Sequence, residues 1–268
     1  MMEERAVRHT ALLLGDITGR SRVAVRMLTA VLEDRGVEVL ALPTALISNT
    51  LNLGRHQAMD TTQYLLDSLN TWEALGLSWD AVHIGYITGS AQAEKLCAVA
   101  DAQREKGRLV VLDPILGDNG RRYNSVTDDQ MAGMRQLMAY ADLITPNLTE
   151  AALLSGVPCE QAASGAENDR MLDVLSGSGA RSVLITSARS KAGGHAMIGF
   201  DADTQEAFEL AYQPLPVSRG GTGDLFSAVM LQLLLVRMSL ADAAQFAGYA
   251  VEGELRKEKS RYLPELAL

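Results

Sequence analysis

The sequence predicts an α/β fold, a three-layer α-β-α sandwich with a mainly parallel central sheet and an antiparallel edge hairpin. Two observations lead to this prediction. Short apolar runs alternate with longer amphipathic segments through most of the 268 residues, and such alternation favours a parallel sheet with helices on both faces. Between His195 and Tyr212 the pattern changes to two short runs around a polar turn, which is typical of a hairpin. The strands are too few for a (β/α)8 barrel.

The individual elements follow from the spacing of apolar residues and from stop signals. The spacing predicts helices over 22–35, 60–75, 91–106, the apolar run from 225, and 240–257. Strands are predicted over 11–14, 37–42, 81–84, 109–112, 143–144, 183–185, 196–200 and 206–212. Gly36 is expected to end the first helix, and 164–168 is expected to be a polar loop. Because no segment has the composition of a linker, residues 1–268 are expected to form a single domain.

Composition narrows the classes of partner. The formal net charge is −9 and 47% of the residues are apolar, so we expect a globular protein with no nucleic-acid and no membrane partner. The two cysteines, Cys97 and Cys159, are far apart and lack metal-ligand spacing, which indicates free thiols in a reducing compartment. The first residues lack the apolar core of a signal peptide. We therefore expect a cytoplasmic location.

A glycine-rich segment, Gly220-Gly221-Thr222-Gly223-Asp224, precedes the apolar run from Leu225. Glycines let the backbone curl so that successive N–H groups point into one space, and a helix N-terminus adds its own N–H groups and positive dipole end. With a carboxylate beside it, such an anion hole suits phosphoryl transfer to a hydroxyl group. The same residues also fit an ordinary turn before a core helix. The segment alone therefore leaves both interpretations open.

Polar residues follow one predicted strand after another. In an open parallel sheet, ligands bind beyond the carboxyl ends of the strands, and six such positions converge on one edge here. They are Asp16, Thr44, Gly85-Tyr86, Asp113-Pro114, Thr145-Pro146-Asn147 and Thr186-Ser187. Structural roles compete for some of them: Asn147 and Glu150 have the spacing of a capping box, and Asp113 is able to start a turn. His83 lies inside a predicted strand and is expected to be a core residue.

These motifs together resemble the pyridoxal kinases of the ribokinase-like superfamily. Gly221-Thr222-Gly223-Asp224-Leu225-Phe226 is similar to that family's anion hole and catalytic base. Four further segments occur in the family's order, and the resemblance covers roughly residues 10 to 255. These segments are Leu42-Pro43-Thr44-Ala45, Gly85-Tyr86, Asp113-Pro114-Ile115-Leu116-Gly117-Asp118 and Ile144-Thr145-Pro146-Asn147-Leu148-Thr149-Glu150-Ala151.

The resemblance implies a role for each matching residue. Asp224 would take the proton of the substrate hydroxymethyl group, and the amides of Gly221, Thr222 and Gly223 would hold the charge of the transferring phosphoryl group. The residues that match the substrate pocket are Asp16, Thr44 and Tyr86. Those that match the nucleotide site are Asp118, Tyr123, Asn147, Glu150, Thr186 and Ser187. Those that match the magnesium site are Asp113, Thr145 and Glu150.

The resemblance also implies an activity and its partners. We expect ATP-dependent phosphorylation of pyridoxal, pyridoxamine or pyridoxine at the 5′-hydroxymethyl group, with Mg²⁺ as cofactor and a homodimer as the assembly. Whether a monovalent cation such as K⁺ takes part stays open. Two alternatives remain. Asp16 resembles the hydroxymethylpyrimidine kinases of thiamine synthesis, although several of those carry cysteine where this chain has Asp224. The basic loop Asp16–Arg22 departs from both branches, which leaves a non-catalytic ligand-binding homologue as the second alternative.

Overall fold

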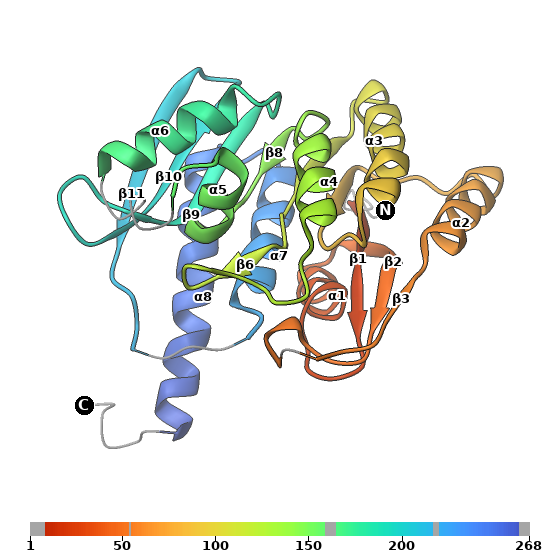
Figure 1. Ribbon diagram of the computed structural model, residues 1–268, viewed down its shortest axis with the longest axis horizontal. Helices are drawn as coiled ribbons and strands as arrows, with labels where there is room; N and C mark the ends of the chain where they lie inside the picture. The colour runs from red at the N-terminus through yellow and green to blue at the C-terminus, as the bar shows by residue number, and fades with distance from the viewer. Residues whose placement is uncertain (1–8, 54, 159–164, 217–219, 263–268) are drawn as a thin grey trace, which may run out of the picture.

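The computed structural model describes residues 9–53, 55–158, 165–216 and 220–262, and its main feature is a nine-stranded sheet (Figure 1). The strand order is β11-β10-β9-β8-β5-β4-β1-β2-β3. Neighbours from β2 to β9 pair in parallel, whereas β10, β11 and β3 pair antiparallel at the two edges. The strands are β1 (Thr10–Thr18), β2 (Glu38–Ile47), β3 (Ala58–Asp60), β4 (Ala81–Ile84), β5 (Leu109–Leu112), β8 (Leu143–Ile144), β9 (Ser182–Arg189), β10 (His195–Asp201) and β11 (Glu206–Tyr212).

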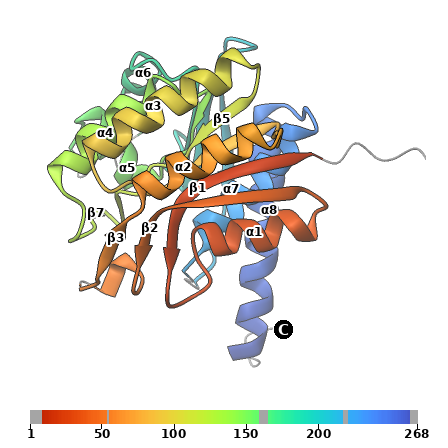
Figure 2. The same ribbon diagram turned by 90° about the vertical axis from the view of Figure 1, so that its right-hand side faces the viewer.

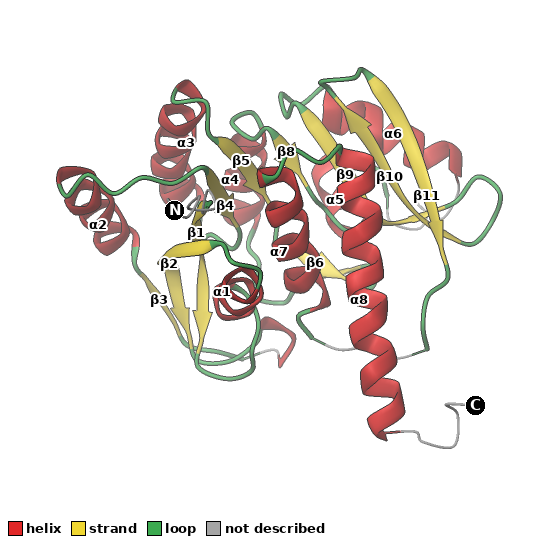
Figure 3. Cartoon of the chain, turned by 180° about the vertical axis from the view of Figure 1, so that it is seen from behind, coloured by secondary structure: helices red, strands yellow, loops and turns green. Residues whose placement is uncertain are grey.

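Helices cover both faces of the sheet, and each face has its own apolar core. Side chains alternate along a strand, so Leu12 and Leu14 of β1 join one core while Leu13 joins the other. Figures 2 and 3 show the two layers on opposite sides of the strands. The first layer holds α2 (Thr62–Ala74), α3 (Ser90–Glu105), α4 (Asp128–Met138), α5 (Leu148–Ser155) and α6 (Gly165–Ser176). The second holds α1 (Val25–Asp34), α7 (Thr222–Leu235) and α8 (Leu240–Tyr262).

The predicted three-layer architecture and its edge hairpin are confirmed. Most predicted elements appear within a few residues of their expected bounds, and Gly36 follows α1 with a φ of 79°. The polar loop expected over 164–168 is wrong in its described part. Here α6 begins at Gly165, and Asn168 is buried with its Nδ2 donating to the Arg189 carbonyl at 2.6 Å. Buried polar side chains such as Asn168 gave this helix the composition of a loop.

The sequence did not predict the two shortest antiparallel pairings. Strand β3 adds three residues to the β2 edge of the sheet. A small separate hairpin joins β6 (Gly117–Asp118) to β7 (Arg121–Arg122) through a two-residue turn, in which Asn119 and Gly120 have φ values of 53° and 74°. Two left-handed residues in succession are what a tight hairpin turn requires, but strands of two residues have no detectable periodicity.

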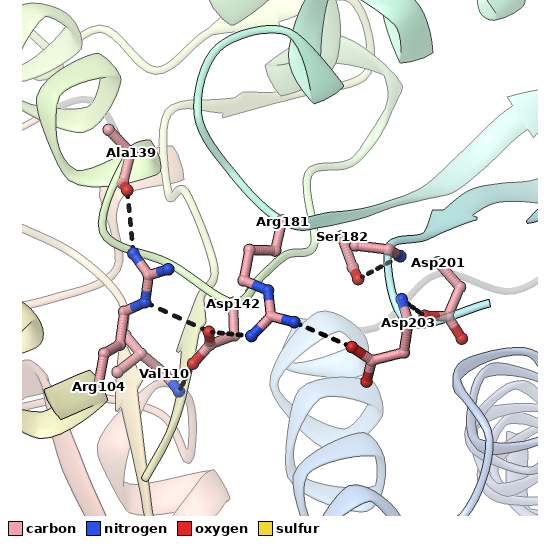
Figure 4. Close-up of polar contacts among 9 residues, drawn as sticks. Arg104, Val110, Ala139, Asp142, Arg181, Ser182, Asp201 and Asp203 are labelled. Carbon is pink, nitrogen blue, oxygen red and sulfur yellow. Dashed lines mark hydrogen bonds and ion pairs between the residues drawn. The ribbon is translucent and has the colours of Figure 1, made fainter. Parts of the chain in front are cut away.

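Charged residues join the loops at the amino ends of the central strands (Figure 4). The carboxylate of Asp142 accepts the Val110 N–H at 2.9 Å and lies 3.3 Å from Nε of Arg104. Arg181 extends this network of ion pairs. Its guanidinium nitrogens lie 3.7 Å from Oδ1 of Asp142 and 3.0 Å from Oδ1 of Asp203 in the β10–β11 turn. Ion pairs and hydrogen bonds within the protein therefore occupy the amino ends of the central strands. The carboxyl ends of these strands are left for ligands.

Candidate active site

Four of the predicted site residues line one cleft at the carboxyl edge of the sheet. Asp16 comes from β1, Tyr86 and Asp113 follow β4 and β5, and Asp224 lies in the first turn of α7. The cavity volume is only about 20 Å³, so the cleft is narrow as it stands. The other lining residues are Gly15, Ala24, Val25, Leu28, His83, Gly85 and Ile115.

The glycine segment forms the start of α7 as predicted. Gly221 precedes the helix with a φ of 91°, and a Cβ there would lie 3.3 Å from the Arg22 carbonyl oxygen and 3.2 Å from Cε of Met27. Both the left-handed conformation and the limited space therefore favour glycine at this position. The helix begins at Thr222, so Gly223 and Asp224 belong to its first turn, where backbone N–H groups have no acceptor within the helix.

Asp224 is half-buried beside the cleft. Burial raises the pKa of its carboxyl group, and the nearby Ala24 backbone N–H has a lowering effect. A carboxylate whose proton affinity is raised in this way is better suited to accept a proton from an alcohol. Its place next to the helix N-terminus puts a base and backbone amide donors side by side.

Asp16 lines the same cleft as Asp224 and is almost inaccessible, with 6% of its surface exposed. Burial, together with the negative charge of Asp224, raises its pKa to about 7, while its own backbone N–H has a lowering effect. No cation among the described residues pairs with it. A group of this kind is suited to hydrogen-bond a polar substituent of a ring that enters the cleft.

Thr44 supports the cleft without lining it. The pairing of β1 with β2 shifts register between Gly15 and Asp16, so that Gly15 pairs with Pro43 and Asp16 with Ala45. Thr44 is the additional residue of this bulge, and bulges re-aim side chains. Its buried hydroxyl donates to the Tyr86 carbonyl at 2.6 Å. Thr44 therefore fixes the backbone of Tyr86, and its contact with the substrate stays a prediction.

Asp113 is the buried carboxyl group at the centre of the site. Ser227 Oγ donates to its Oδ2 at 2.7 Å, and Nε2 of His83 lies 4.0 Å from the same oxygen. Burial raises the pKa of Asp113 to about 7, and the Ser227 hydrogen bond opposes this rise while the Asp224 charge adds to it. Burial lowers the pKa of His83 to about 4, so this ring is neutral near pH 7.

A second group of predicted residues surrounds the start of α5. Asn147 and Glu150 form the predicted capping box, with Oδ1 of Asn147 accepting the Glu150 N–H at 3.0 Å and Glu150 Oε2 accepting the Asn147 N–H at 2.9 Å. Ser187 Oγ accepts the Leu148 N–H at 3.1 Å. Glu150 Oε1 also accepts the Leu116 N–H at 3.1 Å. This group therefore ties β9, α5 and the loop after β5 together next to the cleft.

The burial of Glu150 and the nearby charge of Asp113 raise the pKa of Glu150, whereas its backbone donors oppose that rise. Thr145 follows β8 beside Asp113, and its buried hydroxyl has no hydrogen-bond partner among the described residues. No cluster of three or more His, Cys, Asp or Glu side chains in the described ranges is arranged to hold a metal. Asp113 and the free Thr145 oxygen fit a Mg²⁺ ion that arrives with a nucleotide, because this ion uses few protein ligands besides phosphates and water.

The remaining predicted nucleotide contacts lie at the margin. Asp118 is exposed in β6, where its carboxylate accepts the backbone N–H of Asn119 at 2.7 Å and the side-chain amide at 2.9 Å. Tyr123 is half-buried beyond the hairpin, and burial with the charge of Glu150 raises its pKa. Thr186 is half-buried in β9, with its N–H donating to the Pro146 carbonyl at 3.0 Å. These three residues border the α5 group and not the cleft.

Sequence reasoning missed three contributors to the cleft. Ser227 lies one helical turn after Asp224, and a serine inside an apolar run three residues from a candidate base was an available signal. Ala24 contributes through its backbone, which no residue pattern reveals. His83 is buried in its strand as expected, with 4% exposure, but its ring also lines the cleft.

A parallel sheet with buried carboxylates and a helix N-terminus at its carboxyl edge is the arrangement of the ribokinase-like kinases, which transfer phosphate to a hydroxyl group. The chain belongs to the phosphomethylpyrimidine kinase family, whose model matches residues 30–262. It is 30% identical over 244 residues to the pyridoxine/pyridoxal/pyridoxamine kinase of Bordetella bronchiseptica, covering 87% of this chain and 83% of that one.

Two solved structures show the same likeness. The pyridoxal kinase of Lactobacillus plantarum superposes with a TM-score of 0.77 at 29% identity, covering 93% of this chain and 90% of that one. A structure described as a phosphomethylpyrimidine kinase of Bacteroides thetaiotaomicron, in a form with pyridoxal, gives 0.82 at 29% identity over 90% and 85% of the two chains. None of the helices in the described residues is long and apolar enough to cross a membrane.

Proposed function

We propose that this protein transfers the γ-phosphoryl group of ATP to the 5′-hydroxymethyl group of a vitamin B6 vitamer, giving the 5′-phosphate and ADP. The observation that carries the proposal is the shared cleft of Asp16, Asp113 and Asp224 at the start of α7. The relatives that span most of the chain support the substrate class, because the Bordetella bronchiseptica protein is named for all three vitamers.

The residues divide the work of phosphoryl transfer. Asp224 accepts the proton of the hydroxymethyl oxygen as that oxygen bonds to phosphorus, since an alcohol is otherwise a weak nucleophile. The backbone amides of Gly221, Thr222 and Gly223 stabilise the charge on the transferring group. Asp16 orients the ring by hydrogen bonding, next to Tyr86. The α5 group of Asn147, Glu150 and Ser187, with Thr186, Asp118 and Tyr123 at its margin, borders the nucleotide.

Asp113 and Thr145 would hold Mg²⁺, with Glu150 fixing the loop beside them. When bound, magnesium neutralises charge on the terminal phosphates of the nucleotide. The structure offers Glu150 a different role from the one expected, because its two carboxylate oxygens accept backbone N–H groups of Leu116 and Asn147. We therefore assign metal contact first to Asp113 and Thr145.

A hydroxymethylpyrimidine is the second candidate substrate, because the matching family model carries the name phosphomethylpyrimidine kinase. Both rings are of similar size and present a hydroxymethyl group, so the cleft residues serve either reaction. Asp224 favours the B6 vitamers, and the buried Asp16 is the residue that contacts the part of the ring where the two substrates differ.

The test is a substrate panel. Purified protein is incubated with ATP and Mg²⁺ and, separately, with pyridoxal, pyridoxamine, pyridoxine and the hydroxymethylpyrimidine, with ADP release as the readout. An analogue with a methyl group in place of the hydroxymethyl group is the matched control. We expect ADP release with at least one vitamer and none with the analogue. Release with the pyrimidine alone would favour the second candidate, and no release with any ring would favour a non-catalytic binding protein.

We further propose a cytoplasmic homodimer. Leu46 of β2, Met59 of β3 and Tyr64 of α2 are exposed along one edge of the sheet, with exposed fractions of 42%, 63% and 59%. Exposed apolar side chains at an edge strand suit contact with a second copy. Cys97 is a buried free thiol, in keeping with a reducing compartment, while Cys159 lies outside the described residues. Light scattering on the purified protein tests the dimer.

A further inference from the structure

The buried side chain of Gln130 makes hydrogen bonds in three directions at the start of α4. Only 3% of its surface is exposed. Its Oε1 accepts the Thr127 backbone N–H at 2.8 Å, which is part of the capping box of α4. Its Nε2 donates to the Ile87 carbonyl at 2.8 Å and to the Tyr86 hydroxyl at 2.9 Å. A capping box requires only the first of these bonds, so the other two need a separate explanation.

The backbone partners of Gln130 determine which way its amide is oriented. The Thr127 N–H is only a donor, so the amide oxygen must face it. The Ile87 carbonyl is only an acceptor, so the NH2 group must face that carbonyl. One hydrogen of the NH2 group is used by Ile87, and the other is directed at Tyr86. The Tyr86 oxygen therefore accepts this bond and must direct its own hydrogen elsewhere.

The hydrogen of the Tyr86 hydroxyl has no acceptor within the described part of the chain. Tyr86 is 4% exposed and lines the cleft. Burial raises the pKa of Tyr86, the Gln130 hydrogen bond has a lowering effect and the Asp16 charge a raising one, so the hydroxyl keeps its proton near pH 7. A buried O–H group is normally satisfied by the protein, by water or by a ligand. The partner of this O–H must therefore come from outside the protein.

Two residues that are not in the lining of the cleft share the placement of Tyr86. The Thr44 hydroxyl donates to the Tyr86 carbonyl at 2.6 Å and so fixes its backbone. Gln130 contacts the other end of the same residue, at the hydroxyl. Thr44 therefore sets where Tyr86 lies, and Gln130 sets whether its hydroxyl group offers a hydrogen or a lone pair.

We propose that Gln130 is a positioning residue whose amide occupies the Tyr86 oxygen, so that the Tyr86 O–H donates to an acceptor atom on the ring that enters the cleft. The inference rests on the proposed function, in which a pyridine or pyrimidine ring binds beside Asp16. It adds a requirement on that ring, which must present an oxygen or nitrogen lone pair to Tyr86. A substituent that only donates would leave the buried Tyr86 hydrogen without a partner.

A double-mutant cycle tests whether Gln130 acts through Tyr86. Gln130→Met removes the amide at similar size, Tyr86→Phe removes the hydroxyl, and a third protein carries both substitutions. Gln130→Glu is a second variant for the case that Gln130→Met does not fold, because a carboxylate still accepts the Thr127 N–H and has no hydrogen for Tyr86. For each protein, kcat, the KM for the ring and for ATP, the Kd for the ring without ATP and the thermal midpoint are measured.

Gln103→Met is the matched control, made in the wild type and in the Tyr86→Phe background. Gln103 is also buried, and its Oε1 accepts the Trp79 Nε1–H at 3.1 Å, just before β4 at the amino end of the sheet. Its replacement should lower the thermal midpoint and leave the Kd for the ring unchanged in both backgrounds. A general loss of stability is thereby separated from a specific effect on ring binding.

Tyr86→Phe and Gln130→Met are each expected to raise the KM and Kd for the ring by about three- to tenfold, as for the loss of one hydrogen bond. The kcat and the KM for ATP should change by less than about twofold. In the Tyr86→Phe background, either substitution of Gln130 should raise the Kd by less than about 1.5-fold, although it still lowers the thermal midpoint.

An effect of Gln130 on the Kd that is equal in both backgrounds, or absent in the wild-type background, would overturn the inference. Ring binding with the expected coupling but without phosphorylation would support the role of Gln130 and contradict the proposed function. Phosphorylation without the coupling would do the reverse. A wild type that binds none of the rings would contradict both.

Discussion

The hydroxyl of Ser227 donates to Oδ2 of Asp113 at 2.7 Å, one helical turn beyond Asp224 and inside the protein. This bond links α7, which carries the proposed base Asp224, to the end of β5. It is the donor that the buried Asp113 carboxyl group has available in an environment that otherwise disfavours its charge. The same helix therefore places Asp224 in the lining of the cleft and holds the neighbouring Asp113 carboxylate.

Ser227→Ala is expected to lower both stability and activity. The unfolding free energy should fall by about 1–3 kcal/mol, because a buried acceptor loses its donor. Urea denaturation measures this change. Ser176→Ala is the matched control, since the buried Ser176 hydroxyl has no partner among the described residues and its removal should cost little. Equal effects of the two substitutions would show that the bond to Asp113 contributes nothing.

Asp16 is expected to make the protein less stable as the pH rises. Its pKa is about 7 in the folded protein and near 3.9 in an unfolded chain, so between these values the folded state keeps a proton that the unfolded state has released. The unfolding free energy therefore decreases from pH 4 to pH 7 and stays low above it. Asp16→Asn should remove this loss and gain roughly 2–4 kcal/mol at pH 8.

Urea denaturation at pH 5 and pH 8 measures the effect of Asp16→Asn. The exposed Asp34 at the end of α1 gives the control, because Asp34→Asn should leave the pH dependence of the wild type unchanged. A variant at Asp16 that lost stability at pH 8 would contradict the raised pKa. The phosphorylation activity is expected to fall in Asp16→Asn and to stay at the wild-type level in Asp34→Asn.

Glu150→Ala is expected to destabilise the protein and weaken ATP binding. Two backbone N–H groups, those of Leu116 and Asn147, would lose a buried acceptor, at about 1–3 kcal/mol each. The loop after β5 would then loosen, so the KM for ATP should rise more than the KM for the vitamer. Glu105→Ala on the exposed side of α3 serves as control and should change stability by less than about 0.5 kcal/mol. An unchanged KM for ATP would separate this residue from the nucleotide.

Gly117→Ala is expected to distort the β6–β7 hairpin. A Cβ at Gly117 would overlap the Arg121 carbonyl oxygen, so the hairpin must open, and the Gly117 carbonyl would lose the bond that Asn147 Nδ2 makes at 2.8 Å. We expect a lower thermal midpoint and a higher KM for ATP. Gly253→Ala, inside α8 with open space around it, should instead raise stability by about 0.5–1 kcal/mol. A neutral Gly117→Ala would show that the hairpin is free to shift.

The features that could be predicted from the sequence are those that depend on local periodicity or on helix-capping residues. Strands 81–84, 109–112 and 206–212 occur at their expected bounds, because apolar runs and turn residues delimit them. The Asn147–Glu150 capping box is confirmed, because its two hydrogen bonds depend only on local spacing. Asp16, Asp113 and Asp224 meet in one cleft because of the parallel strand topology. The alternation of apolar runs with amphipathic segments already predicts that topology.

Other features depend on contacts that no local pattern contains. The register shift at Thr44 lies between the Gly15–Pro43 and Asp16–Ala45 pairs, which join residues 28 and 29 positions apart in the chain, and the Thr44 hydroxyl binds the Tyr86 carbonyl from there. Ser227 and Asp113 are separated by 114 positions.

The most direct test of the central claim is the turnover of Asp224→Asn with ATP, Mg²⁺ and the preferred vitamer. The amide cannot accept the hydroxymethyl proton, while burial of a neutral side chain should leave the thermal midpoint equal or higher. If Asp224 is the base, kcat/KM falls by about 10²-fold or more in a folded protein. Undiminished turnover in Asp224→Asn would contradict the assignment.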